Sequence, residues 1–388
     1  MTADANRRWI AAFLLLSMAF MSAVFAVQGA LLSAMIGAFD LQASSQGTAY
    51  AMAFGGGILA LAAAFFLQGR WRKRTLLKAA MLLCAAALAL LRLAPGYASY
   101  CVVWFVLGFG LGLMDTLLSA CMADLYAGDA AKRMMCMLHT AFGLTSGLTP
   151  MGYAALMKRG LTWKQVYLVI AACGALLLLI AQLVRSAGRI TDDEPIRVRP
   201  VSLGAVFSDI RESRIAGLVA AMLCHGIFLS GLNTWINRYA DTLPGSFAIP
   251  AQSCLFAGIM LSRLLMPFLP VRADRYVRLG GLLGSVALVA GLFFPNGIAL
   301  RAALALSGLL FGALIPCILT IGCGRKSGNT LLVTTAMMLA LYLGQAVSSP
   351  LIATLESAFT LRAGIMACPA FMALCSICCI ADARQPSS

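Results

Sequence analysis

The sequence predicts an all-α integral membrane protein with twelve transmembrane helices, arranged as two related six-helix halves. The composition is the first reason: 61% of the 388 residues are hydrophobic and 11% are charged, whereas soluble domains carry about 25% charged residues. The second reason is that apolar runs long enough to cross a bilayer recur along the whole chain. The third is a set of landmarks that repeats at a constant interval.

The apolar runs account for most of the chain. Each is about 17 residues or longer, the length that an α-helix needs to cross the hydrocarbon core. They cover residues 10–39, 48–68, 75–91, 97–120, 134–157, 163–184, 215–237, 250–271, 279–294, 298–323, 329–355 and 363–381. Twelve transmembrane helices follow from these runs.

The net charge of +15 is distributed unevenly. With a cytoplasmic N-terminus, 21 of the 29 lysines and arginines fall in cytoplasmic segments, 7 fall in outer segments, and the remaining one, Arg263, lies within a span. This is the positive-inside pattern, so we expect both termini on the cytoplasmic side of the cell membrane and no nucleic-acid partner. Arg7 and Arg8 before an apolar run also fit a signal peptide, but the run continues to Phe39 and its removal would leave eleven spans.

A polar interval at residues 185–214 separates the first six predicted spans from the last six. We therefore predict an N-terminal six-helix bundle at 1–184, a cytoplasmic linker at 185–214 and a C-terminal six-helix bundle at 215–388. A shift of 200 residues superposes Gly108 on Gly308, Gly112 on Gly312, Pro150 on Pro350, and Arg72 on Arg272. A constant shift across separate spans predicts a duplication, with the halves related by an axis along the membrane normal.

The fourth predicted span contains a carboxylate, Asp115, deep inside its apolar run. An ionisable group at this depth costs roughly 2.5 to 3.5 kcal/mol on insertion scales, so its presence indicates a function. Gly108, Gly112, Asp115 and Ser119 share one helix face, and glycines allow helices to approach closely. Asp115 should therefore face the bundle. The residue 200 positions later is Ile315, so the charge belongs to one half only.

The segment between the second and third spans, Gly69-Arg70-Trp71-Arg72-Lys73-Arg74, resembles the cytoplasmic basic signature of the major facilitator superfamily (MFS) transporters. With the twelve spans and the duplication, the resemblance covers essentially the whole chain. It implies the MFS fold, a central cavity, alternating access, and a gating role for Arg70, Arg72 and Arg74. The signature's Asp is missing, with Gly69 in its place, which puts a full charge lock in doubt. The alternative is that these residues are only positive-inside anchors.

A narrower resemblance is to the fucose-permease-like branch. Gly112-Leu113-Met114-Asp115-Thr116 is similar to that branch's fourth span, and the fifth span adds Leu138-His139, Phe142-Gly143, Gly147 and Pro150. Departures are also present: Ser119 replaces the usual Asn, and the first span lacks the common acidic residue. This resemblance does not carry a substrate over to the chain.

Asp115 and His139 are candidates for proton coupling. Counted from the helix ends at about 1.5 Å per residue, both lie about 10 to 14 Å from the cytoplasmic boundary. Histidine changes its charge near neutral pH, which suits a protonatable pair with a carboxylate. The alternative is a structural hydrogen bond between two helices.

Other polar residues are candidates for substrate binding. Amide side chains both donate and accept hydrogen bonds, which suits a polar neutral solute. The candidates are Gln28, His225, Asn233, Asn237, Trp235, Arg263, Tyr342 and Gln345. Three alternatives stay open: Arg263 has a structural role or balances Asp115, His225 is a core histidine, and Trp235 is a membrane-interface residue.

The sequence therefore predicts a secondary active transporter that moves a small polar organic solute, functions as a monomer and is coupled to protons. One alternative is proton-driven efflux of drugs or apolar metabolites, and another is a transporter-shaped receptor or scaffold without turnover. No P-loop, catalytic constellation or metal spacing occurs, so we expect neither an enzyme nor a cofactor. The thirteen cysteines are interpreted as small core residues.

Overall fold

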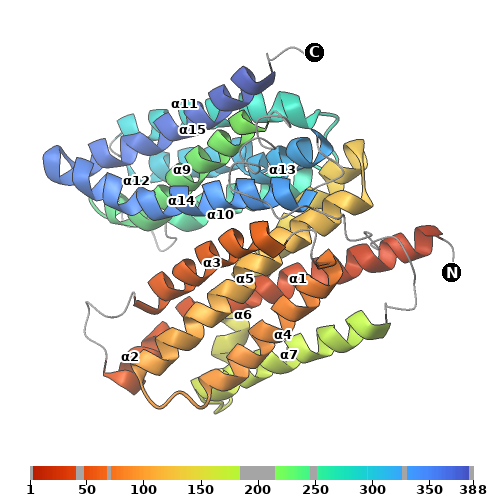
Figure 1. Cartoon of the computed structure of the whole chain (residues 1–388). Helices are drawn as coiled ribbons and strands as arrows, with labels where there is room; N and C mark the ends of the chain where they lie inside the picture. The colour runs from red at the N-terminus through yellow and green to blue at the C-terminus, as the bar shows by residue number, and fades with distance from the viewer. Residues whose placement is uncertain are drawn as a thin grey trace. The chain divides into compact units, whose positions relative to one another are not determined.

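The structure is a computed structural model, and it describes residues 3–40, 48–67, 71–183, 215–244, 251–294, 296–325 and 330–383 (Figure 1). Every regular element in these ranges is an α-helix. The helices of the first half are α1 (Ala3–Ala30), α2 (Leu32–Phe39), α3 (Thr48–Leu67), α4 (Lys73–Leu91), α5 (Tyr97–Leu125), α6 (Gly128–Lys158) and α7 (Trp163–Leu183). Those of the second half are α9 (Ala216–Ala240), α10 (Ala251–Leu265), α11 (Ala273–Phe293), α12 (Gly297–Phe311), α13 (Leu314–Arg325), α14 (Thr330–Ala358) and α15 (Leu361–Ala383).

The predicted twelve spans are confirmed. Two of the spans are each made of two helices. Leu31 separates α1 from α2, and two residues separate α12 from α13. Counting each of these pairs once gives twelve spans in the described ranges. Nine helical segments within the described residues are long and apolar enough to cross a membrane on length and composition alone.

The chain divides into two compact units. Unit 1 contains residues 1–126, 138–202 and 330–335, and unit 2 contains residues 127–137, 203–329 and 336–388. The first turns of α6 therefore belong to unit 2, and those of α14 belong to unit 1. The predicted linker at 185–214 lies outside the described residues, and the predicted domain boundaries stay a prediction.

Glycines hold α3 against α5 in unit 1 (Figure 1). A Cβ atom on Gly56 would meet the backbone of Phe105 and Phe109, and one on Gly108 would meet the backbone of Ala53. Backbone atoms cannot move aside as a flexible side chain can. The two helices can approach this closely only because these positions have no side chain.

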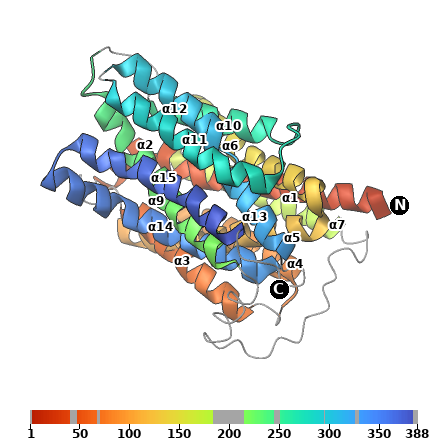
Figure 2. The same cartoon turned by 90° about the horizontal axis from the view of Figure 1, so that it is seen from above.

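The same arrangement recurs in unit 2. A Cβ atom on Gly258 of α10 would meet the backbone of Ala305 and Leu309 of α12, and one on Gly308 would meet Leu255. Elsewhere in unit 2, α9 contacts both α14 and α15 (Figure 2), with Gly226 against Leu341 of α14. The predicted duplication is therefore confirmed in the packing as well as in the sequence landmarks.

Two helix boundaries in unit 2 differ from the predicted runs. α10 ends at Leu265, six residues before the end of its run, because Pro267 disfavours helical geometry in the residue before it. α11 begins at Ala273, six residues before its run, because the first turns carry Asp274 and Arg278 and are too polar for a hydropathy signal.

Candidate functional site

Asp115 lies on α5, a helix of 29 residues, and most of the residues near it are buried apolar side chains and glycines. Its side chain is partly exposed. In the described part of the chain no hydrogen bond or ion pair involves its carboxylate. One turn later, the hydroxyl of Ser119 is buried and also has no hydrogen-bond partner among the described residues. Unit 1 thus contains an acid that is available to a proton or a solute.

His139 lies on α6 and is buried, with 7% of its surface exposed. α6 is held against α1 by the Ser22 hydroxyl, which donates to the carbonyl of Phe142, and by the Tyr153 hydroxyl, which donates to the carbonyl of Ala23 at 2.8 Å. Within the described residues no hydrogen bond or ion pair joins His139 to Asp115. The predicted pair therefore stays a prediction.

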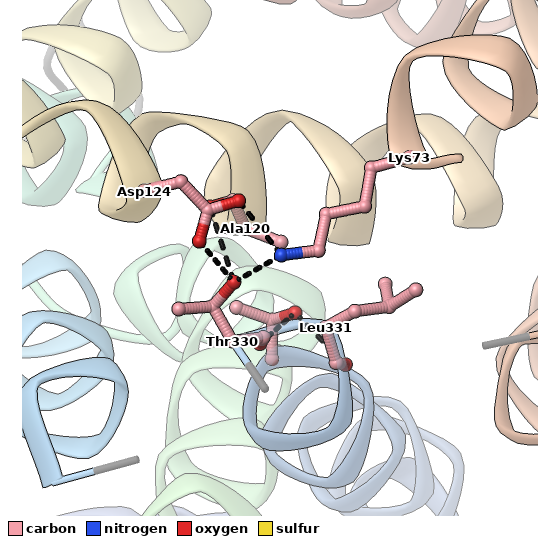
Figure 3. A network of polar contacts seen from close by, with 6 residues as sticks. Lys73, Ala120, Asp124, Thr330 and Leu331 are labelled. Carbon is pink, nitrogen blue, oxygen red and sulfur yellow. Dashed lines mark hydrogen bonds and ion pairs between the residues drawn. The ribbon is translucent and has the colours of Figure 1, made fainter. Parts of the chain in front are cut away.

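A closed polar triangle lies at one end of unit 1 (Figure 3). Lys73 Nζ lies 2.7 Å from Asp124 Oδ2 and donates to Thr330 Oγ1 at 2.7 Å. The Thr330 hydroxyl in turn donates to Asp124 Oδ1 at 2.6 Å. The side chains of Lys73 and Asp124 are only 14% and 15% exposed, so the ion pair is largely shielded from solvent. The triangle connects α4, α5 and the first turn of α14.

The residues predicted to act in gating lie beside this triangle or outside the described part. Arg72 is exposed immediately before α4, and Arg74 is half-buried in the first turn of α4. Arg70 lies outside the described residues. Sequence reasoning named the arginines of the basic segment and passed over Lys73, because the sequence does not show which cation reaches Asp124.

Three amide side chains meet at the end of α9 and the start of α10 in unit 2. Asn237 Nδ2 donates to Gln252 Oε1 at 3.0 Å, and Asn237 Oδ1 accepts from the backbone N–H of Gln252 at 3.0 Å. Gln252 Nε2 donates to Asn233 Oδ1. Asn233 and Asn237 were predicted to bind substrate, and Gln252 was missed because a single Gln after a proline carries no recognisable pattern. The amide N–H groups of Asn233 have no partner among the described residues.

His225 lies on α9 with 1% of its surface exposed. Its ring packs edge to face against Phe228, with centroids 4.6 Å apart, and lies 6.2 Å from the ring of Phe311. Neither ring nitrogen has a hydrogen-bond partner within the described residues. The aromatic contacts fit a core histidine, whereas the two unpartnered nitrogens fit a site for a water molecule or a solute.

Arg263 lies on α10 and is buried, with 8% of its surface exposed. Its Nε–H donates to the carbonyl of Gly312 at 3.0 Å. In a regular helix that carbonyl would accept from residue 316, but Pro316 has no N–H group. The next bond of the ladder, from Cys317 N to Ala313 O, is present at 3.1 Å. Arg263 thus satisfies the carbonyl that the proline leaves open at the break between α12 and α13.

The remaining candidates are more dispersed. Trp235 and Tyr342 are partly exposed on α9 and α14. Gln345 is partly exposed, and its backbone carbonyl accepts from the Ser230 hydroxyl at 3.5 Å. The side chain of Gln28 lies outside the described part. Of the eight predicted substrate residues, Asn233 and Asn237 share a hydrogen-bonded cluster with Gln252.

The described residues contain no group of three or more His, Cys, Asp or Glu side chains placed to hold a metal ion. The model of one transporter family, the Major Facilitator Superfamily, matches residues 13–327 of the chain. The chain belongs to the Major Facilitator Superfamily. The superfamily predicted from the sequence is therefore confirmed, and the protein is a multi-pass membrane protein of a transporter family.

Several solved MFS structures have the same fold. The transporter FucP in its outward conformation aligns with a TM-score of 0.81 at 16% identity, over 97% of this chain and 100% of FucP. Another structure is of FucP as the fucose:proton symporter of E. coli, with a TM-score of 0.80 at 15% identity, over 97% of this chain and 100% of that one. The human organic anion transporter MFSD10 has a TM-score of 0.76 at 14% identity, over 96% of this chain and 99% of its own. No curated protein sequence matches this chain significantly.

Proposed function

We propose that this MFS protein is a secondary active transporter that moves a small polar organic solute across the cytoplasmic membrane by alternating access, coupled to protons. Both termini would then lie in the cytoplasm, as the charge bias predicts, and a single chain would suffice for transport. The fold shared with a fucose:proton symporter supports proton coupling as a hypothesis for this chain.

The state of Asp115 is the observation that carries the proposal. The carboxylate is partly exposed, lies near the middle of a spanning helix and has no polar partner among the described residues. A permanent negative charge there would be costly, whereas an acid that takes up and releases a proton can be neutral during part of the cycle. Ser119, one turn away, supplies a hydroxyl that can bind either form of the acid.

The amide cluster supports a polar solute. Amides of Asn233, Asn237 and Gln252 satisfy one another in part, and the exposed Asn233 keeps its donor groups available. A hydroxylated solute can bind such a cluster without leaving buried amides unpaired when it departs. His225, with two unpartnered ring nitrogens, is the next group in unit 2 that we propose for solute binding.

The Lys73, Asp124 and Thr330 triangle is proposed as part of the gate, together with Arg70, Arg72 and Arg74. α14 contributes its first six residues to unit 1 and the rest to unit 2. If the units move against each other during transport, the bonds to Thr330 must break or α14 must bend. The triangle would then stabilise one of the two access states.

The test uses purified protein in vesicles with an inward proton gradient and a panel of labelled monosaccharides, polyols and small carboxylates. We expect one class to accumulate in the wild type. Asp115→Asn should lose accumulation by at least tenfold and keep solute exchange at zero gradient, because the neutral amide still permits the conformational cycle. Asp129→Asn, which changes an acid with a 77% exposed side chain on α6, is the matched control and should accumulate normally.

Undiminished accumulation by Asp115→Asn would contradict proton coupling through this residue. Gradient-driven movement of apolar dyes without any polar solute would favour the efflux alternative. If ligands stabilise the protein and none is transported, the receptor or scaffold alternative is favoured.

A further inference from the structure

Two cysteines from separate helices meet inside unit 2. Cys136 lies about two turns into α6, and Cys317 lies in the first turn of α13. Both side chains are fully buried, and the two thiols are hydrogen-bonded to each other. The structure has them as thiols and not as a disulfide. Because the sulfur atoms are already in contact, a small approach brings them to the S–S bond length of about 2.05 Å.

Lys132 fixes this part of α6 within unit 2. Its Nζ donates to the carbonyl of Val271 at 2.7 Å and to that of Leu269 at 3.4 Å, and both carbonyls belong to the segment between α10 and α11. Cys136 lies one turn after Lys132, so both side chains project from the same face of α6. Residues 127–137 belong to unit 2, and α6 belongs to unit 1 from residue 138 on. The thiol of α6 therefore lies at the point where the helix changes unit.

The thiol of α13 is also held in place. The N–H of Cys317 donates to the carbonyl of Ala313 at 3.1 Å, and the carbonyl of the preceding residue, Gly312, accepts from Arg263. Arg263 and Lys132 both interact electrostatically with Cys136. Their positive charges can compensate a thiolate, which is the form of cysteine that reacts with oxidants.

Two comparisons distinguish this pair of cysteines. The residues 200 positions away from them are Ala336 and Leu117, so the duplicated positions carry no thiols. Another pair of thiols in contact, Cys224 of α9 and Cys378 of α15, has no interaction with a cation among the described residues. Both α9 and α15 lie entirely within unit 2, so a bond between those two helices would not restrain a helix that both units share.

We propose that Cys136 and Cys317 form a reversible disulfide that stops the transport cycle, an inference that rests on the proposed function. The oxidant that we assign is hydrogen peroxide, because it is small and uncharged and both thiols are buried. As the O–O bond breaks, one thiol takes one oxygen and becomes a sulfenic acid, and the other oxygen leaves as water. The second thiol then displaces that oxygen as a second water, and the S–S bond forms. A thiol reductant reverses the reaction and is itself oxidised to a disulfide.

The position of the bond explains its effect on transport. Alternating access requires the units to move, and α6 belongs to both of them. The start of α6 must then leave α13, or the helix must bend after Met137. A disulfide prevents the first of these movements. Intracellular disulfides are mostly transient and redox-sensing, which fits a reversible stop.

The test treats the full-length protein in vesicles with hydrogen peroxide, blocks the remaining thiols with N-ethylmaleimide and maps linked peptides by mass spectrometry. We expect peptides joined through Cys136 and Cys317 with the loss of two hydrogen atoms. The solute of the labelled panel that accumulates should move at least about tenfold more slowly after oxidation, because the conformational step is blocked. Dithiothreitol should reverse both changes.

Three variants serve as controls. Cys136→Ser and Cys317→Ser should transport equally before and after peroxide, whereas Cys378→Ser should respond as the wild type does. Each variant is compared with itself before and after oxidation, so a lower basal rate still gives an answer. Absence of the linked peptides would overturn the proposal, and so would an unchanged transport rate in protein that carries the bond. An equal loss of transport in Cys136→Ser would assign the effect to other oxidised groups and would also overturn it.

A measurement without solute separates this proposal from the proposed function. If the reduced protein moves no solute of the panel, the proposed function fails, and the unfolding midpoint in detergent then tests the link between α6 and α13. A midpoint that rises on oxidation in the wild type but not in Cys136→Ser supports the link, because a disulfide restricts the unfolded chain. An unchanged midpoint overturns it.

Discussion

α5 of unit 1 and the α12–α13 pair of unit 2 occupy equivalent places in the duplication and have different polar chemistry. Glycines pack both against the backbone of a preceding helix, α3 in one unit and α10 in the other. α5 is continuous over 29 residues and carries Asp115, whereas its counterpart breaks after Phe311 and needs Arg263 from α10 to satisfy Gly312. Duplication thus kept the packing and let the polar groups diverge. The residues that differ between the halves are where a directional transport cycle can be built.

The shared glycine packing should give the largest effects. Gly56→Ala in unit 1 and Gly258→Ala in unit 2 each place a Cβ atom against neighbouring backbone. We expect each to destabilise the protein by at least about 3 kcal/mol, near the upper range for overpacking, because helix backbones cannot yield locally. The yield of monodisperse protein and the unfolding midpoint in detergent report the loss.

Gly55→Ala is the matched control for that pair. Its Cβ atom would contact only the Phe105 side chain, at 3.6 Å, which is ordinary van der Waals distance. Near-wild-type stability of Gly56→Ala or Gly258→Ala would show that the two helix pairs do not pack as closely as the comparison requires.

The Lys73–Asp124 pair should come next. Asp124→Leu leaves a largely buried ammonium group without its carboxylate, and we expect a loss of about 2 to 3 kcal/mol, below the range for fully buried pairs since some exposure remains. The double variant Lys73→Met, Asp124→Leu should recover most of this loss. A double variant no more stable than Asp124→Leu would show that the ion pair is not the cause. The Arg278–Asp274 ion pair of unit 2 has both side chains more exposed, so its loss should cost less.

The break between α12 and α13 offers a double-mutant cycle. Arg263→Gln should cost about 1 to 3 kcal/mol, because it removes the donor to a buried carbonyl. Pro316→Ala restores an N–H group that can reach Gly312, so Arg263→Gln should cost less in that background. Equal costs in both backgrounds would mean that Arg263 acts elsewhere, such as on a solute or on Asp115.

The smallest effect is expected at the amide cluster. Asn237→Ala removes the acceptor for the N–H of Gln252, the second residue of α10, and should cost about 1 kcal/mol, as is usual for the loss of a helix cap. Thr234→Ala is the control on the same helix, since its hydroxyl bonds only to Ser230 one turn earlier. A solute that binds the cluster should show a larger change in affinity with Asn237→Ala than with Thr234→Ala.

Much of the fold was predictable because its determinants are local in the sequence. Long apolar runs fix the spans, the charge bias predicts the topology, and the shift between Gly108 and Gly308 revealed the duplication. The two interrupted spans were not predicted. Both breaks lie inside continuous apolar runs. Pro316 lies close to the second break, but the sequence does not show which group bonds to the carbonyl that this proline leaves without a helical partner.

The polar contacts were harder to predict because they depend on geometry across helices. Lys73 lies in a run of cations, and nothing in that run indicates which one reaches Asp124. Gln252 meets Asn237 only because the start of α10 lies against the end of α9. The sequence singled out Arg263 as an unusual charge, but its hydrogen bond to the carbonyl of Gly312 depends on the broken helix, which the sequence did not predict.

The most direct test of the account measures proton movement itself. Vesicles with a pH-sensitive dye inside, no imposed gradient and a transported solute added outside should acidify with the wild-type protein. Asp115→Asn should bind and exchange the same solute without acidification, and Asp129→Asn should behave as the wild type. Solute-driven acidification by Asp115→Asn at the wild-type rate would contradict the claim that the one unpaired carboxylate of α5 carries the proton.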